Sequence, residues 1–97
     1  MSEQYILAID VGTTEIKAAL VSHQGEIRDC TRSASRVLHP QPTWAEQDPN
    51  DWWHSVCSAV RELWRQSHVS PDCISGLVFS TQMFGVLPVD VDGKPLT

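Results

Sequence analysis

The residues best suited to chemistry lie close together near the start of the chain, in the run Asp10-Val11-Gly12-Thr13-Thr14, with Lys17 just beyond. Hydroxyls beside main-chain N–H groups form concave sets of donors that bind anions, and a glycine lets a ligand approach the backbone closely. A carboxylate such as Asp10 can hold a hydrated Mg²⁺, which binds through one or two carboxylates plus phosphate oxygens. These residue types together predict binding of a polyphosphate with its metal ion.

The same residues also have a plainer interpretation. Asp, Gly and Thr are ordinary residues of hairpin turns, and Lys17 could be a solvated side chain on a strand. Short motifs match by accident, so this segment leaves both interpretations open when it is taken alone.

Two short apolar runs flank the segment and predict the element that would position it. Residues 5–9 and 16–21 are strand-like, and the gap between them leaves room only for a tight turn. The segment would therefore occupy the tip of a β-hairpin. A second turn is expected around Gly25, followed by a third, mostly polar strand over residues 27–36.

The third strand has one competing interpretation. Arg28, Arg32 and Arg36 are four residues apart, which also fits one face of a helix. We favour the strand because the intervening Thr and Ser residues are weak helix formers. The proline-rich connection that follows, residues 39–44, is expected to be extended, and no role is assigned to its Trp44.

A strong helix start comes next. Asp48 suits the N-cap, Pro49 the first helical position, and Asp51 adds favourable charge to the first turn. Apolar residues then follow at helical spacing until about Ser67, and they are Trp52, Trp53, Val56, Cys57, Val60, Leu63 and Trp64. We interpret these tryptophans as core residues that pack on a sheet, because each large aromatic can bury roughly 150–250 Å².

The last third of the chain predicts another strand and another hairpin. Residues 74–80 form a nearly continuous apolar run, typical of an interior strand covered on both faces, and the strand–helix–strand order favours parallel pairing with an earlier strand. Residues 86–91 and 94–96 flank Asp92-Gly93, a strong hairpin signal. The returning strand barely begins, which suggests a truncated domain.

The expected architecture is α/β: three antiparallel strands, a crossover helix, a parallel fourth strand and a hairpin, as in part of a ribonuclease H-like domain. A nuclease on this fold needs carboxylates on several elements to hold two metal ions. The fourth strand ends in Ser80-Thr81-Gln82, without an acid, and the helix offers only Glu62 near its far end. A phosphotransferase needs the hydroxyl-rich turn and one acid, and both are present.

Composition excludes several other functions. With 12 acidic and 7 basic residues, the 97-residue chain has a formal charge of −5 and no basic run, which argues against nucleic-acid or anionic-membrane binding. No segment approaches membrane-spanning length, and the polar, acidic start predicts a cytoplasmic protein. Three widely spaced cysteines fit neither a disulfide framework nor a zinc site, and we expect buried or partly buried free thiols: Cys30, Cys57 and Cys73.

Three motifs in register resemble the N-terminal region of the FGGY carbohydrate kinases, which include xylulose kinases and glycerol kinases. Residues 8–17 are similar to the first phosphate-binding motif of that family. Residues 43–49 with 51–53 are similar to the loop that leads into its first helix. Residues 80–85, Ser-Thr-Gln-Met-Phe-Gly, resemble the Ser-Gly-Gln-Met-His-Gly segment of xylulose-kinase-like members.

The resemblance implies an actin-like ATPase fold, ATP and Mg²⁺ as cofactors, a sugar or polyol substrate, and specific residue roles. Asp10 would orient Mg²⁺ through water. The implied contacts to the ATP phosphates are Gly12, Thr13, Thr14 and Lys17, and those to the sugar are Gln82, Met83 and Phe84. Without the resemblance, the latter group would merely link a strand to a hairpin. Phe84 stands where xylulose-kinase-like members have histidine, and Thr81 where glycine is common, so the particular sugar is not implied.

In the family that these motifs resemble, two ribonuclease H-like domains close over a cleft. Residues 1–97 would be the N-terminal part of the first domain, with the catalytic base and the adenosine site beyond residue 97. Since phosphoryl transfer requires substrate, metal and nucleotide to be positioned together, the chain alone is expected to be inactive. The alternative is a non-catalytic module that forms homo-oligomers through unfinished sheet edges.

Overall fold

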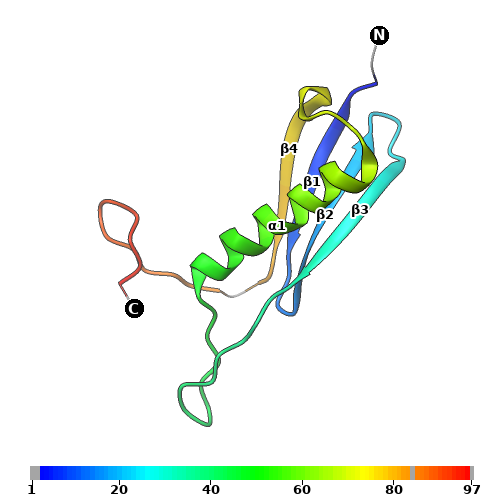
Figure 1. The fold of residues 1–97 in the computed structure, drawn as a ribbon. Coiled ribbons are helices and arrows are strands. Elements are labelled where there is room, and N and C mark those ends of the chain that lie inside the picture. The colour runs from blue at the N-terminus through cyan, green and yellow to red at the C-terminus, as the bar shows by residue number, and fades with distance from the viewer. Residues whose placement is uncertain (1–2, 84, 97) are drawn as a thin grey trace.

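The computed structural model of the chain describes residues 3–83 and 85–96. A four-stranded sheet carries one long helix across one of its faces (Figure 1). The elements in chain order are β1 (Tyr5–Val11), β2 (Glu15–Ser22), β3 (Ile27–Ala34), α1 (Pro49–Ser67), the 3₁₀ turn η1 (Pro71–Cys73) and β4 (Ile74–Thr81).

The sheet has the strand order β3-β2-β1-β4. β1 pairs with β2 and β2 with β3 in antiparallel fashion, whereas β4 pairs with β1 in parallel. The three antiparallel strands, the crossover helix and the parallel fourth strand predicted from the sequence are therefore confirmed. β3 ends at Ala34, two residues earlier than expected.

The hydrophobic core lies between α1 and the face of the sheet that the helix covers. Successive strand residues point to opposite faces, so alternate residues of β1 and β2 face the helix. On β3, Thr31 replaces an apolar residue, and its hydroxyl donates a hydrogen bond of 2.7 Å to the carbonyl oxygen of Ala59. The buried apolar residues are Tyr5, Leu7, Ile9, Ile16, Ala18, Leu20, Ala59 and Leu63.

Both ends of α1 have identifiable caps. The Asp48 carboxylate accepts a 2.9 Å hydrogen bond from the main-chain N–H of Asn50, and Pro49 occupies the first turn. At the other end His68 adopts a left-handed conformation with φ 59°, and its N–H donates to the Trp64 carbonyl. The helix bounds predicted from the sequence are confirmed.

The tryptophans do not all share the core role expected of them. Trp52 and Trp64 are partly buried and pack against the core. Trp53 is 67% exposed, so its predicted place in the core is wrong. Adjacent helical residues point about 100° apart, because the helix has 3.6 residues per turn, and the turn that directs Trp52 to the sheet directs Trp53 away from the core.

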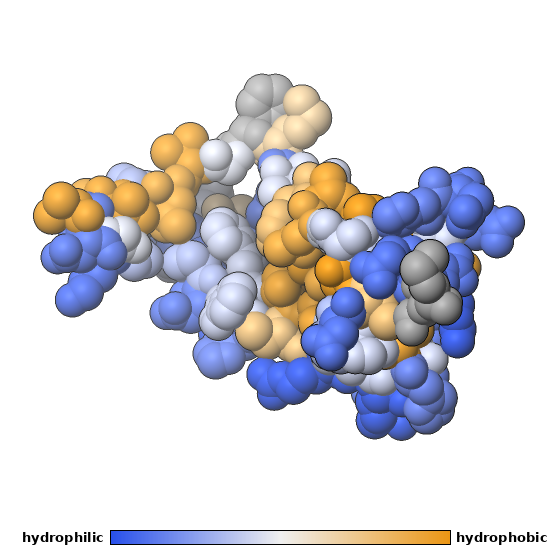
Figure 2. Space-filling model, turned by 90° about the horizontal axis from the view of Figure 1, so that it is seen from above, coloured by the Kyte–Doolittle hydropathy of each residue, from blue (hydrophilic) through white to orange (hydrophobic). Residues whose placement is uncertain are grey.

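β4 is an edge strand in this chain, and the prediction of an interior strand covered on both faces is wrong here. Leu77, Val78 and Phe79 are each more than half exposed. The reason is geometric: α1 lies mainly over β2 and β3, and on β4 it is the first residue, Ile74, that packs against the core. Figure 2 shows hydrophobic surface through the middle of the molecule and on the C-terminal segment, residues 85–96, which projects to the left.

Two loop predictions also differ from the structure. Residues 39–44 are not extended: Leu38 and Glu46 pair as an antiparallel bridge, and the Trp44 N–H closes a turn onto the Gln41 carbonyl. Pro40 and Pro42 lack only their own N–H groups. The N–H of Trp44 can therefore still donate, and its bond to Gln41 turns the chain back. The tip of this loop carries Trp44, which is half exposed.

The C-terminal hairpin forms with a single bridge, between Val89 and Pro95, in place of two predicted strands. The prolines interrupt a regular ladder because they lack an N–H. The Asp90 carboxylate stabilises the turn by accepting hydrogen bonds from the main-chain N–H groups of Asp92 and Lys94.

The three cysteines are free thiols, as expected. Cys57 and Cys73 are partly buried, but Cys30 is exposed on β3, so its predicted burial is wrong. Cys30 falls on the face of β3 opposite to Thr31, away from the helix. Within the described residues, no helix is long and apolar enough to cross a membrane.

Removing a core side chain should cost far more stability than removing an exposed one. Leu63, on the face of α1 that packs on the sheet, is fully buried, so Leu63→Ala is expected to lower the free energy of unfolding by about 2–5 kcal/mol. Leu96→Ala, at a residue that is 63% exposed, is the matched control and should change it by less than about 0.5 kcal/mol. Urea denaturation measures both values, and equal losses would contradict the assignment of the core.

Candidate functional site

The turn between β1 and β2 is tightly closed at its base. The Gly12 N–H donates a 3.1 Å hydrogen bond to the Glu15 carbonyl, and Val11 pairs with Ile16 below it. A Cβ atom on Gly12 would lie 2.8 Å from the Glu15 carbonyl oxygen. The glycine is required by this close approach of two backbone segments, since its φ lies outside the left-handed region.

Thr13 and Thr14 are exposed at the tip of this turn. The Thr14 carbonyl accepts a hydrogen bond from the Ser35 N–H, which ties the turn to the end of β3. The tip is accessible from solvent, and two hydroxyls and two main-chain N–H groups are gathered there. This is the set of donors that a phosphate group needs.

Asp10 lies at the end of β1 and is partly exposed. Its neighbour Ile9 is in the core, so Asp10 belongs to the sheet face opposite to α1. By register, it lies between Lys17 of β2 and Ser80 of β4. Asp10 thus sits just below the turn.

Lys17 shares a carboxylate with an arginine. Its ammonium nitrogen lies 3.6 Å from the Oε1 atom of Glu15, which is also 3.6 Å from a guanidinium nitrogen of Arg32. Surface pairs of this kind contribute little to stability. Lys17 is therefore held near the turn by an interaction weak enough for an incoming anion to replace.

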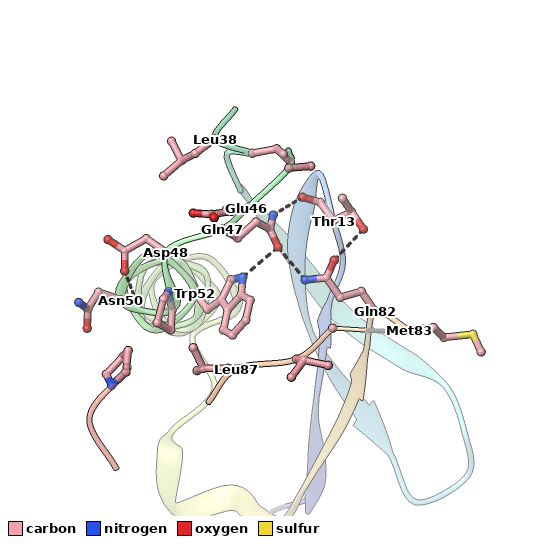
Figure 3. A pocket seen from close by; sticks show the side chains of 16 residues that line it. Thr13, Leu38, Glu46, Gln47, Asp48, Asn50, Trp52, Gln82, Met83 and Leu87 are labelled. Atoms are coloured by element: carbon pink, nitrogen blue, oxygen red, sulfur yellow. Dashed lines mark hydrogen bonds between the residues drawn. The ribbon is translucent and has the colours of Figure 1, made fainter. Parts of the chain in front are cut away.

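A closed ring of hydrogen bonds joins the turn to the end of β4 (Figure 3). The Thr13 hydroxyl donates to the Gln82 amide oxygen at 2.9 Å, across 69 residues of sequence. The Gln82 amide nitrogen donates to the Gln47 amide oxygen at 2.6 Å, and the Gln47 amide nitrogen donates to the Thr13 carbonyl at 2.7 Å. The structure thus brings together residues assigned separately to phosphate and to sugar.

The other two residues expected on the sugar side differ from Gln82. Met83 is 78% exposed and points away from the ring in Figure 3, at the outer edge of the pocket. Phe84 lies outside the described residues.

A pocket of about 710 Å³ opens beside the ring. Its walls come from the β1–β2 turn, the loop that precedes α1, the first turn of α1, the end of β4 and the C-terminal segment. Gln47, Asp48 and Trp52 line it together with Thr13 and Gln82. The lining is mixed: polar side chains such as Thr13, Gln47 and Gln82 stand beside apolar ones such as Leu38, Val86 and Leu87. A few polar groups among apolar walls are typical of small-molecule pockets.

Sequence reasoning assigned no role to Gln47, and it gave Trp52 a role in the core but none in the site. Gln47 lies in the segment 43–49 that resembles a family motif, but only the ring shows what its amide contacts. Nearby, the Asp51 carboxylate accepts a 2.6 Å hydrogen bond from Arg36, and this bond, with the opposite charge, raises the pKa of Arg36. The ion pair joins the segment after β3 to the start of α1.

A metal ion would depend on Asp10 and on groups from the ligand. Among the described residues, no cluster of three or more His, Cys, Asp or Glu side chains is placed to hold a metal. A single carboxylate fits Mg²⁺, which keeps several waters and binds phosphate oxygens. Asp10 therefore suits a magnesium ion that arrives with a nucleotide.

Residues 5–97 match the FGGY family of carbohydrate kinases, N-terminal domain. The chain belongs to this family. The sequence of this FGGY-family chain is 32% identical over 96 residues to a xylulose kinase of Staphylococcus epidermidis and 35% identical over 97 residues to a glycerol kinase of Oceanobacillus iheyensis. Each alignment covers 99% of the chain but only 19% of the relative, so the chain spans about a fifth of their length.

A solved structure supports the same conclusion for the fold of this FGGY-family chain. The crystal structure of a xyloylose kinase from Brucella ovis superposes with a TM-score of 0.92 at 28% identity, over 97% of this chain and 20% of that one. The expected fold class, a partial ribonuclease H-like domain of the actin-like ATPase type, is confirmed.

The close approach at Gly12 predicts a large penalty for a single methyl group. Gly12→Ala should lower the free energy of unfolding by about 1–3 kcal/mol, because the turn must open to accept the Cβ atom. Gly85→Ala is the matched control, since its Cβ atom would meet nothing within 4 Å. Thermal unfolding of both variants compares them, and a Gly12 variant as stable as the Gly85 variant would show that the turn tolerates a side chain.

Proposed function

We propose that this chain is the N-terminal part of the first domain of an ATP-dependent carbohydrate kinase, which transfers the γ-phosphoryl group of ATP to a hydroxyl of a sugar or polyol. The observation that carries the proposal is the direct contact between Thr13 and Gln82. It sets a turn rich in hydrogen-bond donors for phosphate beside a residue that lines the pocket. A phosphoryl donor and an alcohol acceptor must meet in that way.

The donors left for phosphate can be derived from the hydrogen bonds. The Gly12 N–H is used by Glu15, and the single hydroxyl hydrogen of Thr13 is used by Gln82. Within residues 3–83 and 85–96, the N–H groups of Thr13 and Thr14 and the Thr14 hydroxyl have no partner. These three groups would hold the terminal phosphates of ATP, with Lys17 adding positive charge.

Asp10 would hold magnesium through water. When bound, the ion would neutralise part of the charge on the phosphates. Gln82 would hydrogen-bond a hydroxyl of the acceptor, with Met83 at the outer edge of the pocket. The contact to the sugar implied for Phe84 stays a prediction. The chain's own residues would thus position the substrates and neutralise charge on the phosphates.

The catalytic base and the adenosine site would belong to sequence outside residues 1–97, because the relatives are about five times as long. The relatives include both a xylulose kinase and a glycerol kinase, so either a sugar or a polyol is proposed as the acceptor. The cytoplasmic location expected from the sequence stays a prediction.

A second candidate function rests on the exposed apolar residues of β4. An edge strand with free backbone groups can pair with another chain, so the 97-residue chain would act as a non-catalytic module that self-associates. Light scattering separates this candidate from the first, because a monomer at all concentrations excludes it.

The 97-residue chain is expected to show no sugar-kinase turnover, because positioning of the phosphate by one turn cannot replace a complete cleft. A coupled assay of ADP release with xylulose and with glycerol measures this, with a full-length glycerol kinase as the positive control. ADP release that depends on the added alcohol and exceeds background would refute the expectation. Sequencing of the reading frame that carries the 97 codons, followed by the same assay on its whole product, tests the kinase assignment.

The donor assignment predicts a difference between two threonines. Thr14→Val should weaken Mg·ATP binding by about tenfold or more, since a hydrogen bond to a charged group is worth about 1.5–3 kcal/mol. Thr43→Val, at an exposed residue of the loop before α1, is the control and should bind as the unaltered protein does. Isothermal titration calorimetry gives the affinities, and identical values for the two variants would remove Thr14 from the phosphate site.

A further inference from the structure

The side-chain amide of Gln47 lies between a neighbour that can only donate and a neighbour that can only accept, and these two neighbours fix its orientation. Its amide oxygen accepts a 3.1 Å hydrogen bond from the indole nitrogen of Trp52, which can only donate. Its amide nitrogen donates to the Thr13 carbonyl, which can only accept. A flipped amide would face a donor with a donor and an acceptor with an acceptor, so one orientation is strongly favoured.

This orientation determines that of a second amide. Since the Gln47 oxygen also accepts from Gln82 at 2.6 Å, the Gln82 nitrogen must face Gln47 and its oxygen must face the Thr13 hydroxyl. The indole N–H of Trp52 therefore fixes the orientation of both amides and, through them, the partner of the Thr13 hydroxyl in the β1–β2 turn. What remains on Gln82 for a ligand is one N–H and one lone pair, in defined directions.

Rigid neighbours hold Gln47 in place. It immediately precedes the N-cap of α1, and its amide nitrogen also lies 3.3 Å from both the Ser35 hydroxyl and the Arg36 carbonyl. Trp52 packs against the hydrophobic core, so the indole that orients the amide is itself fixed. Gln47 is partly buried, which limits competition from water.

We propose that Gln47, oriented by Trp52, is a positioning residue: it sets the directions in which Gln82 presents its remaining N–H and lone pair to the acceptor hydroxyl, and it keeps the Thr13 hydroxyl directed at Gln82. The role of Gln82 toward an acceptor rests on the proposed function. The orientation of the two amides does not, because it follows from contacts within the chain.

Proton NMR of the 97-residue chain without ligand tests the inference. In Gln47→Met, which keeps the length of the side chain but loses its amide, the Trp52 indole N–H should exchange with water about two- to tenfold faster, the factor expected from one lost hydrogen bond. The Gln82 side-chain amide signals should also shift. Gln47→Glu keeps an acceptor for Trp52, so it should retain slow indole exchange. Gln41→Met is the matched control in the same loop and should change neither signal.

Unchanged indole exchange in Gln47→Met, or an equal change in Gln41→Met, would overturn the proposal. Fast indole exchange in a Gln47→Glu variant that circular dichroism shows to be folded would also overturn it. The proposal requires that the glutamate oxygen replace the amide oxygen as the acceptor for Trp52. A titration with glycerol and with xylulose then tests the proposed function separately. If the Gln82 signals respond to the variants but to neither alcohol, the positioning by Gln47 stands and the acceptor role of Gln82 fails.

Discussion

The pairing of β1 on both of its edges is the constraint on which the site depends. The antiparallel partner β2 must connect through a turn at the end of β1, whereas the parallel partner β4 must run alongside β1 and end at that same point. A main-chain hydrogen bond of 2.9 Å from the Gln82 N–H to the Val11 carbonyl continues this parallel pairing past the strand. The turn and the residues after β4 are therefore neighbours because of backbone geometry, before any side chain is considered.

The crossover helix has two functions in this arrangement. A parallel connection needs a long crossover, and α1 supplies it while covering the apolar face of β1 and β2. Its N-terminus is placed at the same end of the sheet as the turn, so the loop that precedes it can contribute Gln47 and its first turn can contribute Trp52. The core and the pocket share a residue, since Trp52 packs against the one and lines the other.

The apolar side chains of β4 are exposed, and the chain matches only part of the length of its relatives; these two observations are consistent with each other. An all-apolar strand is stable when both faces are covered, and here the described residues cover neither face of β4 completely. The chain matches only 19% of the length of each of these relatives. The open edge and the proposed position of this chain at the start of a larger kinase domain are thus two aspects of the same interpretation.

Local signals in the sequence were sufficient for most of the elements. Short apolar runs predicted β1 and β2, the Asp48-Pro49 pair predicted the start of α1, and Gly12 marked the turn. These features follow from nearest-neighbour sterics and hydrogen bonding, which a short stretch of chain specifies by itself. Local signals failed where a long-range contact decides: they placed Trp53 in the core, β4 in the interior and residues 39–44 in an extended conformation.

The sequence by itself determined the fold class, the family and the residue types of the candidate site, because propensity, periodicity and motif order are properties of the linear chain. Only the tertiary structure showed that Thr13, Gln47 and Gln82 form one hydrogen-bonded ring. Their amide and hydroxyl groups have no preferred partners in the sequence. Those partners are set by the parallel pairing of β4 with β1 and by the position of the indole of Trp52, which exist only once the core has formed.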